Sequence, residues 1–170
     1  MTVLPTWDLF ITLFFVIGIA YGLILQKDKT ILTIISTYAA LIVVNAIAPT
    51  IQSYMVGEQN IMGQVFIKSN TNLFTIKSVI FILIIALVST KSGLSGKDTG
   101  GVLSPIELFA YSFFSTMLVI ASIFSFMTVE TRTGFAASSK IASLIMQYEV
   151  WWVVLPVVLL IITGFMHKSE

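Results

Sequence analysis

The chain has 170 residues, of which 57% are hydrophobic and 10% are charged. Soluble domains carry roughly 25% charged residues, so this composition argues against a soluble protein and indicates one embedded in a membrane. A net charge of +1 provides no general attraction to nucleic acid, and the lack of cysteine excludes disulfides and thiolate chemistry. His167 is the only histidine, which excludes a histidine-based metal cluster within one chain.

An apolar run at 7–25 predicts the first membrane-spanning helix, and residues 1–7 lack the basic residues of a cleaved signal peptide. We interpret Asp8 as a carboxylate favoured by the helix dipole, with a buried ionisable group in a pathway as the alternative. Gly18 and Gly22 are spaced as in the G-x-x-x-G pattern, which lets a neighbouring helix approach closely. The alternative is that small residues are simply common in membrane helices.

A polar stretch at 26–29 predicts a tight turn into a second span at 30–48, which we expect to end at Pro49. Thr30, Thr33 and Thr37 fall on one face of this span, where they suit packing and hydrogen bonding between helices. Threonine hydroxyls also bond to their own helix, so the stripe does not prove a pore. The stretch at 50–73 is compatible with short interfacial helices.

The third predicted span is 74–90, and a glycine-rich loop follows it. The loop residues that could bind an anionic lipid headgroup or a partner are Lys91, Gly93, Gly96, Lys97, Gly100 and Gly101. Glycine amides and a helix start can approach an anion, and lysines are attracted to anionic headgroups. We favour the alternative, which is a flexible connector carrying positive-inside lysines.

Ser104, Pro105 and Glu107 form a helix-start pattern for a fourth span at 105–128. Small hydroxylated residues recur along it, which predicts a position inside the bundle. They are Ser112, Ser115, Thr116, Ser122 and Ser125. We expect residues 130–134 to form a loop.

Apolar residues at 141, 144, 145 and 148 follow the helical period, so residues 140–148 predict a short amphipathic helix in the headgroup plane. Trp151 and Trp152 come next and are typical interfacial anchors. A fifth span is predicted at 150–166, with a kink at Pro156. We therefore expect one integral membrane domain over 1–170, an all-α polytopic bundle of four or five transmembrane helices plus one interfacial helix.

The loops after the first and third spans are short, fall on the same side and carry four lysines. Short basic loops face the cytoplasm, which predicts an N-terminus outside and a C-terminus inside. The acidic residues lie at span ends or in loops, and the sequence contains no P-loop, H-E-x-x-H or G-x-S-x-G motif. We expect no enzymatic activity, no cofactor and no bound metal.

Three features resemble the CvpA family, named for colicin V production. They are Trp7-Asp8 with Gly18 and Gly22, the short charged turn into the second helix, and the Gly-Leu-Ser-Gly-Lys-Asp run at 93–98 before the fourth span. The resemblance covers 7–127. The chain departs from the family in having Gln26-Lys27 where an Arg-Gly is frequent, a serine-rich fourth helix and a strongly apolar last segment.

The resemblance implies a bacterial inner-membrane accessory or scaffold protein linked to export or envelope homeostasis, without an enzymatic role. From the residues alone, the alternative is a channel or transporter subunit that acts as an oligomer. Either role involves the lipid bilayer and contacts with further copies of the chain or with other membrane proteins. Neither role involves nucleic acid.

Overall fold

The computed structural model describes residues 6–56, 72–91 and 105–166, and within these ranges every regular element is a helix. Within the same ranges, four segments are long and apolar enough to cross a membrane: Trp7–Ile24, Lys29–Tyr54, Leu73–Thr90 and Ile106–Ser125. A bent pair of helices, Lys140–Gln147 with Glu149–Gly164, raises the number of candidate spans to five. The predicted all-α membrane bundle is confirmed.

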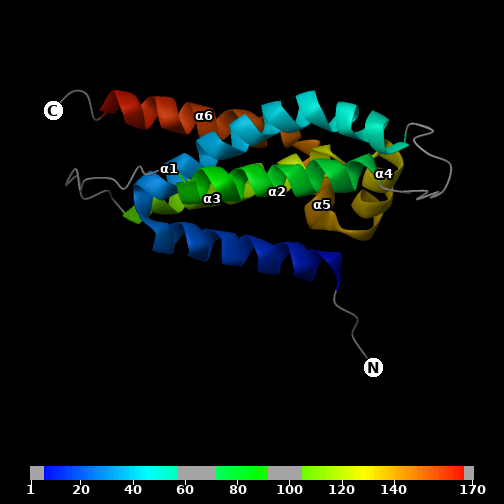
Figure 1. The fold of residues 1–170 in the computed structure, drawn as a ribbon. Helices are drawn as coiled ribbons and strands as arrows, with labels where there is room; N and C mark the ends of the chain where they lie inside the picture. The colour runs from blue at the N-terminus through cyan, green and yellow to red at the C-terminus, as the bar shows by residue number, and fades with distance from the viewer. Residues whose placement is uncertain (1–5, 57–71, 92–104, 167–170) are drawn as a thin grey trace.

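The first helix, α1 (Trp7–Val56), carries two of these spans, and Figure 1 shows that it bends sharply between them. We call Trp7–Ile24 the first arm and Lys29–Tyr54 the second arm. The hydroxyl of Thr30 donates to the carbonyl of Gly22 at 3.0 Å, although eight residues of straight helix would span about 12 Å. The turn expected at 26–29 is therefore a bend within a helix.

The second arm continues through Pro49 to Val56, so the prediction that Pro49 ends this helix is wrong. Proline removes one backbone donor, which membrane helices tolerate when neighbouring groups compensate. Here tertiary packing favours the longer helix, because Ala48 is fully buried and Ile51 packs against the same apolar cluster. That cluster also contains Ile76 and Phe81 of α2 (Leu73–Lys91).

The helix α3 (Pro105–Ser125) lies at the centre of the bundle, as its hydroxylated residues predict. Of its span, 56% is buried, against 33% or less for the other three spans. Met117 and Ile120 pack with the first arm, whereas Leu118 packs with Ile34 of the second arm. One helix therefore contacts both arms of α1.

Residues 129–138 form a helix, α4 (Val129–Ser138), so the expected loop at 130–134 is wrong and the α3 helix ends at Ser125 rather than near 128. Thr128 caps α4, and its side chain accepts a hydrogen bond from the Thr131 amide. Gly134 within α4 costs about 1 kcal/mol relative to alanine, which the cap offsets in part. The N-cap threonine was the sequence feature that could have predicted this helix.

The amphipathic helix expected at 140–148 is present as α5 (Lys140–Gln147). Its apolar side does not simply face lipid, because Ala142 and Ile145 are buried in a cluster with Ile11 and Phe124. Figure 1 shows α4 and α5 gathered at one end of the bundle. At this end Trp7 contacts Phe135, with ring centroids 4.5 Å apart.

The last helix is α6 (Glu149–Met166), which is bent by 64° relative to α5 and packs along α3. Pro156 lies inside it and is fully buried. Tyrosine hydroxyls make polar contacts with α6 from two sides: that of Tyr111 in α3 contacts the Thr163 hydroxyl, and that of Tyr38 in the second arm donates to the carbonyl of Val153. The α6 helix is therefore fixed against both α3 and the second arm.

Candidate functional site

The two glycines of the first arm lie directly against α3. A Cβ atom added at Gly18 would come within 2.4 Å of the Thr116 Cγ2 atom. One added at Gly22 would come within 2.7 Å of the Ser112 Cβ atom and 3.1 Å of its Cα atom. Real side chains do not reach such distances, so this crossing requires glycine on α1 and small residues on α3.

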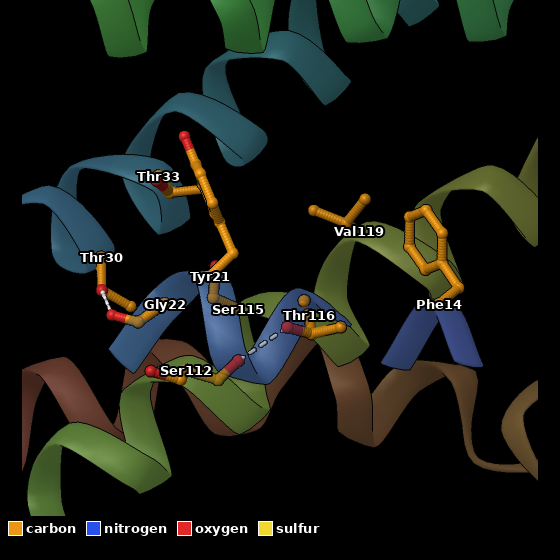
Figure 2. A pocket seen from close by; sticks show the side chains of 10 residues that line it. Phe14, Tyr21, Gly22, Thr30, Thr33, Ser112, Ser115, Thr116 and Val119 are labelled. Atoms are coloured by element: carbon orange, nitrogen blue, oxygen red, sulfur yellow. Dashed lines mark hydrogen bonds between the residues drawn. The ribbon is translucent and has the colours of Figure 1, made fainter. Parts of the chain in front are cut away.

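A pocket of about 110 Å³ lies beside this crossing, between the two arms of α1 and α3. Figure 2 shows the side chains around it, including Phe14 and Val119. The hydroxylated residues that line it come from all three helical segments. They are Tyr21, Thr30, Thr33, Ser112, Ser115 and Thr116.

The hydroxyls around the pocket are mostly bonded to backbone carbonyls. Ser112 donates to Leu108 and Thr116 donates to Ser112, both at 2.8 Å. Thr33 donates to the carbonyl of Lys29 at 2.8 Å. Each bond engages the hydroxyl within its own helix, so these three side chains offer no free donor to the pocket.

The other hydroxyls predicted to pack between helices lie away from the pocket. Thr37 is buried in the second arm and donates to the Thr33 carbonyl at 2.7 Å. Ser122 is buried in α3 and donates to the Leu118 carbonyl at 2.6 Å. Both residues permit close packing, but their hydrogen bonds stay within their own helices.

The glycine-rich loop, for which lipid binding and a flexible connector were the two interpretations, falls almost entirely outside the described residues. Lys91 is the last residue of α2. The positions Gly93, Gly96, Lys97, Gly100 and Gly101 are outside the described residues. Ser104, the predicted cap of α3, is outside as well, whereas Pro105 begins α3.

The two tryptophans expected to anchor the interface have different surroundings. Trp151 is exposed on α6, at 59% of its surface. Trp152 packs against the buried cluster around Phe124, with its ring centroid 6.4 Å from that of Phe113. Its indole Nε1 atom is buried without a hydrogen-bond partner among the described residues. Trp152 therefore contributes to the core, and only Trp151 faces outward like an anchor.

Asp8 has a contact that its position in the sequence did not reveal. Its carboxylate accepts hydrogen bonds from the Ser139 hydroxyl and, at 3.1 Å, from the Ile141 amide. Ser139 in turn accepts from the amide of Ala142 at 3.0 Å. The predicted role at the start of its own helix is thus joined by a second one, capping α5. No local pattern could find it, because Asp8 and Ser139 are 131 residues apart.

Two further charged residues, Arg132 and Lys77, join helices at the periphery of the bundle. Arg132 of α4 pairs with Glu149 at the start of α6. On α2, the Lys77 ammonium donates to the Asn45 side chain at 3.2 Å and lies 5.7 Å from the centre of the Phe126 ring. Lys77 therefore joins α2 to the second arm.

Within the described part of the chain, no group of three or more His, Asp or Glu residues could hold a metal ion. The Ser139–Asp8 pair resembles part of a nucleophile–base arrangement, but Ser139 is occupied in capping α5. The arrangement of residues can hold helices together and can accept a small apolar group in the pocket.

Comparison with known proteins gives no assignment: no protein-family model, no curated protein and no solved structure matches this chain.

Proposed function

We propose that this chain is an accessory or scaffold protein of the bacterial inner membrane, similar to CvpA proteins, that supports export or envelope homeostasis. The observation that favours this role is the contrast between the buried central helix α3 and an exposed apolar periphery. The Ser112 and Thr116 hydroxyls of α3 are bonded within their own helix, while only 11% of the first arm and 11% of the α2 span are buried. Such faces can contact lipid and other membrane proteins.

The proposed orientation places the N-terminus outside and the two lysine-rich short loops in the cytoplasm. Because the chain has no cysteine, a single cysteine in place of Ser95 gives a clean reporter. An impermeant thiol reagent should leave it unlabelled in intact cells and label it after the cells are opened. Strong labelling of intact cells would reject this orientation.

The proposed role is tested in a bacterial strain that lacks the chain. Loss of colicin V export or of envelope integrity, restored by the wild-type chain, is the expected result. An unchanged envelope and unchanged export would contradict the scaffold role. A variant with polar substitutions at two exposed α2 positions, Leu83 and Leu87, should insert normally but fail to restore the phenotype if α2 provides the contact face.

A channel or transporter subunit is the second candidate, and the hydroxylated pocket beside α3 favours it. Rows of hydroxyls in a membrane interior are compatible with a polar pathway that is completed by further copies of the chain. Ion or solute flux from purified protein in vesicles distinguishes the two roles. The scaffold proposal predicts no flux of ions or solutes, so robust flux would reject it.

A further inference from the structure

We propose that the pocket between the arms of α1 and α3 binds the acyl chain of one membrane lipid. The proposal goes beyond the scaffold role and does not depend on it. It concerns the space lined by Phe14, Tyr21, Thr33, Ser115 and Val119 beside the glycine crossing.

The chemistry of the lining favours a hydrocarbon occupant. No charged side chain lines the pocket. The hydroxyls of Thr33, Ser112 and Thr116 already donate to carbonyls of their own helices. These three hydroxyls are therefore not free to donate to a trapped water, which needs about two to four polar partners, whereas an apolar group needs none.

The position of the pocket exposes it to the hydrocarbon layer of a bilayer. Ser115 lies near the middle of the Ile106–Ser125 span, and Phe14 lies in the middle of the first arm. Two of the lining side chains reach the outer surface, because Phe14 is 42% exposed and Tyr21 is 59% exposed. The occupant can therefore enter sideways from the membrane and needs no opening to water.

The size of the pocket suits the end of an acyl chain and not a whole lipid. Its volume is about 110 Å³. An engineered apolar cavity of about 150 Å³ holds benzene, so this space accommodates a few methylene groups. The rest of the lipid would lie along the exposed face of the first arm. The end of the acyl chain would occupy the pocket between the two arms and α3.

The test uses full-length protein in lipid nanodiscs, transferred into mild detergent and weighed by native mass spectrometry. Wild-type protein should retain one phospholipid. Thr33→Phe places a ring in the pocket and should lose that lipid. Ile35→Phe adds a ring two residues along the same arm, at an exposed position, and should keep it. Circular dichroism and a single elution peak verify that each variant is folded.

A second measurement uses the wild-type chain only. A phospholipid with a diazirine at the end of one acyl chain is incorporated, chased with unlabelled lipid and photolysed. Adducts at Val119 should disappear more slowly during the chase than adducts at the exposed Leu83 of α2. Equal rates at the two positions, retention of lipid by Thr33→Phe, or retention of detergent in place of phospholipid would each overturn the proposal.

Discussion

The helices α2 and α3 have similar lengths and are both long and apolar enough to cross a membrane, yet 11% of the α2 span is buried against 56% of the α3 span. The difference follows from side-chain size and polarity. Along α2, large aliphatic residues such as Ile82, Leu83 and Leu87 stay more than half exposed. Along α3, Ser112 and Thr116 allow α1 to approach closely. In a bilayer, where lipid is as apolar as leucine, small hydroxylated residues rather than hydrophobicity identify the central helix.

The largest difference in stability between α2 and α3 is expected for a matched pair of leucine-to-alanine substitutions. Leu118→Ala removes a fully buried side chain of α3 and should lower the free energy of unfolding by about 2–3 kcal/mol, since Leu→Ala cavities cost about 2–5 kcal/mol. Leu83→Ala on α2 removes the same atoms from an exposed position and should have little effect. Titration of detergent-solubilised protein with SDS, followed by tryptophan fluorescence, measures both. Equal losses would contradict the central position of α3.

The next largest effect on stability is expected where Gly18 and Gly22 of the first arm pack against α3. Gly22→Ala puts a Cβ atom into the Ser112 side chain and should destabilise the bundle by about 1–3 kcal/mol, the usual range for overpacking. Gly134→Ala is the control, because its added Cβ would meet no group of a neighbouring helix within 4 Å, and it should stabilise α4 by up to about 1 kcal/mol. The same titration reports both variants. Unchanged stability of Gly22→Ala would show that the two helices do not pack closely.

The contact between Asp8 and α5 should have a smaller effect, confined to one end of the bundle. Asp8→Ala leaves the Ile141 amide without its carboxylate partner, and loss of a helix cap costs about 1 kcal/mol. Hydrogen exchange of the first α5 amides should accelerate, while exchange in the centre of α3 stays the same. Glu130→Ala removes an exposed carboxylate from α4 and serves as the control. Equal exchange in Asp8→Ala and wild-type protein would exclude the cap.

The smallest effect on stability is expected for the hydrogen bond between α2 and the second arm, which joins Lys77 and Asn45. A double-mutant cycle of Asn45→Ala and Lys77→Met should give a coupling energy of about 0.6 kcal/mol, the average for polar contacts between membrane helices. A coupling energy as large as the unfolding free energy lost in Leu118→Ala would contradict a peripheral position of α2. Unfolding by SDS, with the two single variants and the double variant in parallel, measures it.

Local patterns in the sequence predicted the long apolar helices, a reversal of the chain after the first span and the inner position of α3, but they missed the α4 helix. Patterns were misleading where packing overrides local preference, as at Pro49, which the second arm passes through. They were also silent about contacts between distant residues. The Asp8 carboxylate reaches Ser139 only because the bundle brings the start of α1 beside α5. Likewise, two adjacent tryptophans look equivalent in sequence, but successive helical positions face different sides, so Trp152 enters the core and Trp151 does not.

The central position of α3 in the bundle is tested most directly by spin labelling along α2 and α3 in a bilayer, with the accessibility of each label to oxygen as the measurement. The chain has no cysteine, so single cysteines can be introduced one at a time, at 115–124 in α3 and 79–88 in α2. We expect low accessibility at most α3 positions, including Leu118 and Ser122, and high accessibility at Ile82, Leu83 and Leu87. An α3 profile as accessible as that of α2 would contradict a bundle built around α3.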